Sequence, residues 1–186
     1  MPAVLDLLDA ASGPPLWLDD AAYTERLLAG GQTPWLDAAQ YLAFRRKAQS
    51  LLAADLRALP LMGFLRAWVD ARPGLRAAMT AKPRAVFPVR TLLAAEALVP
   101  HLIEIVHGLR ASFPGAPLVL ALPSPRALVL EAWRLAHGAD AVDEVGADEA
   151  DACAVYVAEF LRGFGGCEVD GLLLEETAGA EPASAE

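Results

Sequence analysis

Hydrophobic positions in the first half of the chain recur with the spacing of helices. Apolar residues keep to one helical face, and Gly- and Pro-rich breaks separate the segments. Thr33 is expected to cap the longest segment, with Pro34 at its first helical position. The expected helices are 1–12, 16–31, 33–59 and 61–69, followed by a short one before residue 82. The first 85 residues therefore predict helices and no strand.

The pattern changes after residue 112. Residues 117–122 are a continuous apolar run bounded by prolines, which is typical of a buried parallel strand. Residues 168–174 predict a second buried strand with acidic residues at its C-terminal end. Helices are expected at 89–112, with a kink or joint at Pro100, at 125–136 and at 148–163. The pattern indicates an α/β fold with parallel strands.

The domain organisation follows from these two patterns. We expect a single α/β domain over 1–176, made of a helical N-terminal region, 1–88, and a βα region, 89–176. The small polar residues of 177–186 predict a disordered tail. At 186 residues the chain is too short for a closed eight-stranded (β/α) barrel, which typically needs about 250.

Charge is distributed unevenly along the chain. Residues 41–90 carry ten basic and two acidic groups, whereas residues 131–186 carry two basic and fourteen acidic groups. The net charge of −9 repels a polyanion at long range, so nucleic acid is not an expected partner. The basic and acidic regions are instead expected to face each other, within one chain or across a dimer interface.

Other classes of protein are disfavoured by simple features. No stretch reaches the roughly 20 apolar residues that span a bilayer, and the N-terminus lacks a positively charged signal region, so a cytoplasmic protein is expected. Cys153 and Cys167 match no zinc pattern and are expected to be buried structural thiols. His101 and His107 do not form the i, i+4 pair of helix-borne metal ligands. No phosphate-loop or dinucleotide glycine pattern occurs, so neither a metal nor a cofactor is expected.

The C-terminal half contains a strand that ends in a small residue and proline, LALPSPRAL, and a later strand, VDGLLLEE. In these segments it resembles the superfamily of uroporphyrinogen decarboxylase and cobalamin-independent methionine synthase. The resemblance covers about residues 90–176 and implies part of a TIM-type barrel. Residues 1–60 show no counterpart of the decarboxylases' Arg-rich substrate loop and catalytic Asp, and no His lies at ligand spacing from a Cys, as the methionine synthases require for zinc.

These departures set the functional expectation. The resemblance implies an accessory or catalytically silent partial barrel, which assembles as a homo-oligomer or with a second barrel-type chain. One alternative is a small self-contained enzyme that acts on a small anionic substrate, and another is a charge-driven interaction module. Whether the chain is an enzyme is left open by the sequence.

Candidate catalytic residues lie at the second strand. Glu175 and Asp170 are the candidates, because catalytic groups of parallel α/β folds cluster at the C-terminal ends of strands. A carboxylate there can act as a general base if burial raises its pKa. The alternative is a solvated strand end that leads into a polar tail.

Candidate ligand-binding residues follow the first strand and lie around the start of the 89–112 segment. Ser124 and Arg126 flank a proline at a helix start, where free backbone N–H groups favour an anion. The alternative is an N-cap serine beside a surface arginine. Arg84 and Arg90 bracket an apolar stretch and can bind an acidic ligand, or can be plain surface charges.

Overall fold

The computed structural model describes Val4, Asp6, residues 16–139, Ala141 and residues 145–176. The helix expected over 1–12 and the tail expected over 177–186 lie outside the described residues. By its internal packing the chain divides into two compact units. The first comprises Met1–Phe64, Pro100–Ala121 and Gly166–Leu173, and the second comprises Leu65–Val99, Leu122–Gly165 and Leu174–Glu186. Each unit therefore combines segments from both sides of residue 88.

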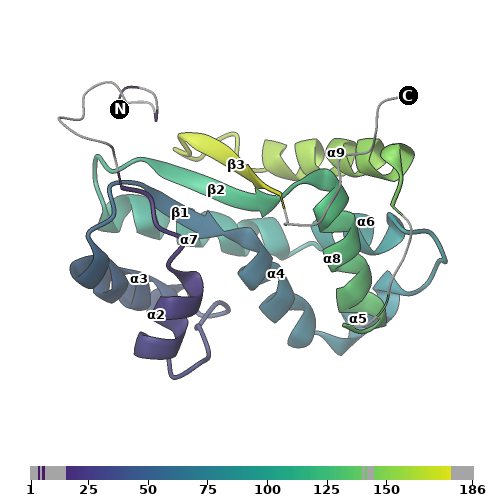
Figure 1. The fold of residues 1–186 in the computed structure, drawn as a ribbon, viewed down its shortest axis with the longest axis horizontal. Coiled ribbons are helices and arrows are strands. Elements are labelled where there is room, and N and C mark those ends of the chain that lie inside the picture. The colour runs from purple at the N-terminus through teal and green to yellow at the C-terminus, as the bar shows by residue number, and fades with distance from the viewer. Residues whose placement is uncertain (1–3, 5, 7–15, 140, 142–144, 177–186) are drawn as a thin grey trace. The chain divides into compact units, whose positions relative to one another are not determined.

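A three-stranded parallel sheet confirms the expected α/β class. Its strands are β1 (Arg57–Pro60), β2 (Leu118–Pro123) and β3 (Gly171–Glu175), side by side in that order (Figure 1). Arg57 pairs with Leu118 and Pro60 with Ala121, in parallel register. Asp170 N donates to Leu118 O over 2.8 Å, and Ser124 N donates to Glu175 O over 2.9 Å. These two bonds advance in the same direction along both strands, so β3 is parallel to β2 as well.

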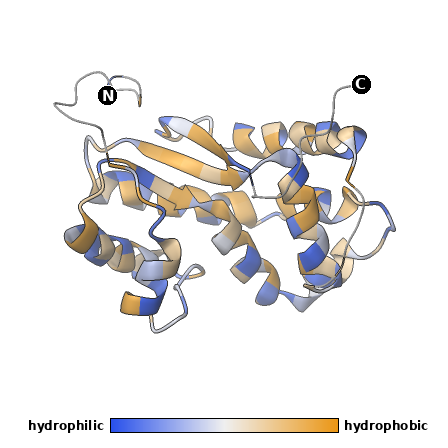
Figure 2. Cartoon of the chain, viewed as in Figure 1, coloured by the Kyte–Doolittle hydropathy of each residue, from blue (hydrophilic) through white to orange (hydrophobic). Residues whose placement is uncertain are grey.

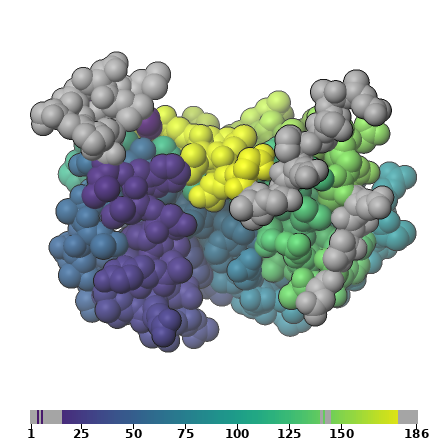
Figure 3. Space-filling model, in the orientation of Figure 1, coloured from purple at the N-terminus to yellow at the C-terminus, as the bar shows by residue number. Residues whose placement is uncertain are grey.

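The central strand β2 is the buried strand that its apolar run predicts. Every residue from Leu118 to Pro123 is buried, and the strand is hydrophobic along its length (Figure 2). The outer strand β3 was expected to be buried as well, and that prediction is wrong. Leu172 is 43% and Leu174 48% exposed, and the strand lies at the surface (Figure 3). An edge strand has a neighbour on one side only, so part of its apolar surface stays accessible.

Strand β1 corrects the expectation that the first 85 residues form no strand. The helix expected over 33–59 ends early, because Ala53 adopts a left-handed conformation with φ of 46°. Arg57 N then donates to Pro117 O over 2.9 Å and begins the pairing with β2. Tertiary pairing overrides helical propensity here, since four residues gain ladder hydrogen bonds and bury Leu59 completely.

The first unit also contains α2 (Ala21–Leu28), α3 (Ala38–Leu52) and most of α7 (Leu98–Ser112). The cap of α3 is Asp37, whose side chain accepts from Gln40 N over 2.9 Å. The expected cap Thr33 instead donates its hydroxyl to Glu25 Oε2 over 2.8 Å. Thr and Asp are both favoured N-cap residues, and in this chain Asp37 takes that position.

The core of the first unit contains a fully buried tyrosine on α3. Tyr41 stacks on Trp35 with ring centroids 5.0 Å apart. Burial raises the pKa of Tyr41 to about 12, opposed by the positive charge of Arg45 and assisted by Asp20. Arg45 and Asp20 form an ion pair of 2.9 Å that joins α3 to the start of α2.

The second unit is helical. It contains most of α4 (Leu61–Asp70), together with α5 (Pro73–Met79), α6 (Phe87–Leu93), α8 (Pro125–His137) and α9 (Ala147–Arg162). Helix α6 contacts α5, α8 and α9, and α8 packs along α9. The helices expected at 61–69, 125–136 and 148–163 are confirmed to within one residue at each end. The glycine that caps α9 is Gly146, whose N–H donates to Glu149 Oε2 over 3.0 Å.

The break between α6 and α7 lies before the proline that was expected to mark it. The helices are separated at residues 94–97, and Pro100 is the third residue of α7. A proline in the first turn of a helix removes no intrahelical hydrogen bond, so it is tolerated there without a kink.

Candidate functional site

Ser124 and Glu176 lie together where β2 and β3 end. Ser124 Oγ donates to Glu176 Oε2 over 2.9 Å, and Ser124 N donates to Glu175 O over 2.9 Å. Ser124 also caps α8 by accepting from Ala127 N over 3.4 Å. Its side chain is buried, and its hydroxyl both donates to Glu176 and accepts from Ala127. The helix start that was expected to bind an anion is therefore occupied by a carboxylate of the chain itself.

The two predicted catalytic carboxylates are not brought together. Glu175 is the last residue of β3 and is exposed, whereas Asp170 precedes the first residue of that strand. Arg126, the other predicted ligand-binding residue at this end, is half-buried in the first turn of α8. The arrangement offers no pair of carboxylates for joint acid–base work.

Asp170 is held in a partly buried network with Arg110 of α7. The two side chains form an ion pair with only 11% and 9% of their surfaces exposed. Asp170 Oδ2 also accepts from Leu118 N over 2.8 Å, and Arg110 donates to the carbonyl oxygens of Ala116, over 2.8 Å, and Glu168. These contacts satisfy both charges, so the geometry supports a structural role that ties α7 to the starts of β2 and β3.

A small cavity in the second unit gathers positive charge. It has a volume of about 240 Å³, and we call it the cationic pocket. Its lining residues are Lys82, Arg84, Val86, Phe87, Arg90 and Tyr156. Among the residues that the structure describes, no carboxylate lines it, and none of its three cations forms an ion pair.

The chain builds this pocket from a connection and two helices. Lys82 and Arg84 lie between α5 and α6, where Pro83 prevents the earlier helix from continuing. Phe87 N donates to Arg84 O over 2.9 Å, which turns the chain into α6. Arg90 follows on α6, and Tyr156 comes from α9, which packs on α6.

Aromatic rings hold two of the three cations. Lys82 Nζ lies 5.2 Å from the centre of the Phe87 ring, and the Arg90 guanidinium lies 5.9 Å from that of Tyr156. A ring face attracts a cation without accepting its N–H groups in the way that a carboxylate does. The donors of Lys82 and Arg90 therefore stay available for an anionic ligand.

A second cavity shares Arg84 and Val86 with the cationic pocket. Its volume is about 470 Å³, and Asp148 and Glu149 from the first turn of α9 line it. Glu149 is engaged by the backbone of Gly146. Asp148 and Glu149 thus line a cavity together with Arg84, yet neither forms an ion pair with it.

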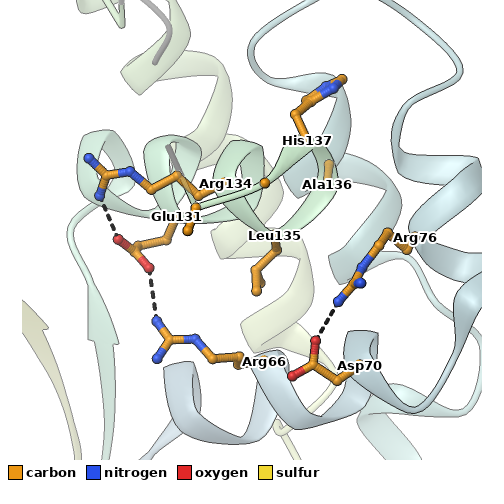
Figure 4. Close-up of a pocket in the computed structure, with 10 residues that line it drawn as sticks. Arg66, Asp70, Arg76, Glu131, Arg134, Leu135, Ala136 and His137 are labelled. Carbon is orange, nitrogen blue, oxygen red and sulfur yellow. Dashed lines mark hydrogen bonds and ion pairs between the residues drawn. The ribbon is translucent and has the colours of Figure 1, made fainter. Parts of the chain in front are cut away.

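A larger open groove in the same unit has its charges paired, and we call it the paired groove (Figure 4). Its volume is about 750 Å³, and residues of α4, α5 and α8 line it. Glu131 accepts from Arg66 over 3.1 Å and from Arg134 over 2.9 Å, and Asp70 forms an ion pair with Arg76. Each arginine of this groove already has a carboxylate partner.

The two thiols have different environments. Cys153 is fully buried, as expected, and burial raises the pKa of its thiol to about 12. Cys167 is only partly buried, which corrects the expectation for this residue, and its Sγ lies 3.7 Å from His107 Nε2. Burial raises the pKa of Cys167 as well. Within the described ranges, no group of three or more His, Cys, Asp or Glu residues is placed to hold a metal ion.

Sequence reasoning found part of the cationic pocket and missed the rest. The sequence predicts an acidic-ligand site at Arg84 and Arg90 and does not single out Lys82. The signal for Lys82 was its position in a run of three cations within nine residues. Tyr156 lies 66 residues beyond Arg90 in the sequence, so only the packing of α9 on α6 places it there.

Comparisons with protein-family models, curated proteins and solved structures found no match to this chain. Among the described residues no single helix is long and apolar enough to span a membrane, although Phe87–Leu93 and Leu98–Ser112 reach that length and composition as a bent pair.

Proposed function

We propose that this chain binds a small anionic ligand in the cationic pocket. The observation that carries the proposal is the convergence of Lys82, Arg84 and Arg90 on one cavity that no carboxylate of the described residues lines. Like charges brought together in a folded protein repel one another, so an anion that binds between them relieves that repulsion and gains charge-assisted hydrogen bonds.

The size and walls of the pocket narrow the ligand class. Pockets for drug-sized molecules begin at about 300 Å³, so 240 Å³ accommodates a compact group such as a phosphate or a small carboxylate. Lys82 and Arg90 cover faces of the Phe87 and Tyr156 rings, which leaves those faces unsuited to stacking a ligand ring. A phosphorylated or carboxylated small molecule fits best.

The test is calorimetric titration with inorganic pyrophosphate and with citrate, at low and at physiological ionic strength. The variant Arg84→Ala/Arg90→Ala is expected to bind about tenfold more weakly or worse, because two charge-assisted contacts are lost. The matched control is Arg26→Ala/Arg46→Ala, which removes the same charge from exposed positions on α2 and α3.

Two outcomes would overturn this proposal. One is an equal loss of affinity in the control, which would identify binding as non-specific attraction to surface charge. The other is the absence of measurable binding of either anion to the unaltered protein at low ionic strength.

A second candidate is an accessory α/β unit related to uroporphyrinogen decarboxylase, which forms part of a barrel completed by another chain. Three parallel strands in chain order, with helices between them, favour it, as does the exposed edge strand β3. Parallel strands connected through helices in sequence order are the building units of (β/α) barrels.

Light scattering at low and high salt tests this second candidate. A defined oligomer that persists at high salt is expected, because completing a sheet buries apolar area that salt does not screen. A monomer at every concentration and ionic strength contradicts self-association. Such a monomer leaves anion binding at the cationic pocket unaffected, so the two proposals fail separately.

A further inference from the structure

We infer that the ligand of the cationic pocket is a small zwitterion, with its anionic group in that pocket and a protonated amine in the adjoining cavity. The adjoining cavity is the one of about 470 Å³ that Asp148 and Glu149 line together with Arg84. This inference rests on the proposed anion binding and adds the chemical class of the ligand. All the residues that line the two cavities belong to the second unit.

The two cavities share part of their walls. Arg84 and Val86 line both of them, and both residues lie just before α6. A molecule that places an anionic group beside Arg84 in the cationic pocket therefore extends into the second cavity along the same two residues. The second cavity is about twice as large as the cationic pocket, so it accommodates the rest of the molecule.

The carboxylates of the second cavity determine which group it favours. Glu149 accepts a hydrogen bond from Gly146 N over 3.0 Å. The Asp148 side chain is exposed and forms no ion pair with a residue that the structure describes. An ionised carboxylate only accepts hydrogen bonds, so it favours a donor, and a protonated amine adds the opposite charge. Asp148 is therefore the residue expected to bind the amine.

The charge of the whole chain also favours a zwitterion over a plain anion. The net charge is −9, so a multiply charged anion is repelled at long range. A ligand that carries its own ammonium group has a smaller net charge and is repelled less, while its anionic group still meets three cations at short range. The second cavity is also lined by Pro83, Ala85, Val86 and Ala152, which suit a short hydrocarbon linker between the two charges.

The test is calorimetric titration of the full chain with aminoalkyl phosphates whose linkers have two, three or four carbons. Each is compared with the alkyl phosphate of the same length, in which a methyl group replaces the ammonium. At least one aminoalkyl phosphate is expected to bind about threefold to fivefold more tightly than its alkyl analogue, because it gains an ion pair with an exposed carboxylate. This preference is expected to shrink at high salt.

Asp148→Asn is expected to abolish the preference for the amine. The matched control is Asp151→Asn, which removes the same charge from an exposed position on α9 outside the lining of the cavity and is expected to keep the preference. Acidic residues in the first turn also stabilise a helix. The readout is therefore the ratio of two affinities within one variant, which a change in the stability of α9 does not mimic.

The outcomes separate this inference from the proposed anion binding. Equal affinity of the unaltered protein for every aminoalkyl phosphate and its alkyl analogue overturns the zwitterion and leaves anion binding in place. A preference of the same size in Asp148→Asn also overturns it, because the amine would then be recognised by the net charge of the chain or by another group. The absence of measurable binding of every ester overturns both proposals.

Discussion

The paired groove and the cationic pocket each gather three cations in the second unit, and they differ in what surrounds those cations. In the groove, Glu131 and Asp70 neutralise all three arginines. In the pocket, aromatic rings hold two of the cations, and the part of the chain that the structure describes places no carboxylate in the lining. The groove is about three times larger, yet its charges are already satisfied. Pairing, more than volume or the number of charges, therefore distinguishes a structural cluster of cations from a ligand site.

The largest effect is expected where a paired charge is also buried. Asp170→Ala leaves Arg110 without its carboxylate and is expected to lower the free energy of unfolding by about 3 kcal/mol, as measured by urea denaturation. A change below about 1 kcal/mol would contradict the structural role assigned to this pair.

The next effect comes from placing a carboxylate in the cationic pocket. Val86→Glu is expected to weaken pyrophosphate binding by about tenfold or more, because it supplies the partner that the pocket lacks. A Gln side chain has the same size as Glu and no charge, so Val86→Gln serves as the control in the same calorimetric titration. Equal losses in both variants would mean that shape, and not charge, governs binding.

The converse change should make the groove resemble the pocket. Glu131→Gln removes the carboxylate that Arg66 and Arg134 share, and it is expected to cost about 0.5–1 kcal/mol of unfolding free energy. In an Arg84→Ala/Arg90→Ala background, the same change is expected to give the protein a new, weak affinity for pyrophosphate. If no such affinity is gained by titration, unpairing alone does not create a ligand site.

The smallest effect is expected at the most exposed pair of the groove. Asp70 and Arg76 have 55% and 45% of their side-chain surfaces exposed. Asp70→Asn is therefore expected to change the free energy of unfolding by less than about 0.5 kcal/mol, and the difference should vanish in high salt. A larger, salt-resistant loss in urea denaturation would show that this pair contributes to the packing of α4 and α5.

Local signals predicted much of the helical structure. The helix start at Ser124-Pro125 and the buried run of β2 are confirmed because their determinants lie within a few residues. Strand β1 was missed because its four residues resemble the end of a helix, and only pairing with β2 makes them a strand. The exposure of β3 was missed for a related reason, since an apolar run does not reveal whether its strand has one neighbour or two.

The candidate sites divide in the same way. Proximity in the sequence identified Arg84 and Arg90. Tyr156 meets Arg90, and His107 meets Cys167, only through contacts between residues 60 or more positions apart. Ser124 was noted as an anion site, yet the carboxylate that it binds is Glu176 of the same chain. Patterns along the chain do not report which charged groups meet in space.

The sequence alone determined the α/β class, the boundaries of α4, α8 and α9, and the central buried strand, because periodicity, capping and proline act over a few residues. Only the tertiary structure decided which strands pair, which carboxylates neutralise which arginines, and which cations form no ion pair with a described residue. The physical reason is that an ion pair or a strand ladder depends on distances of a few ångströms between residues far apart in the chain.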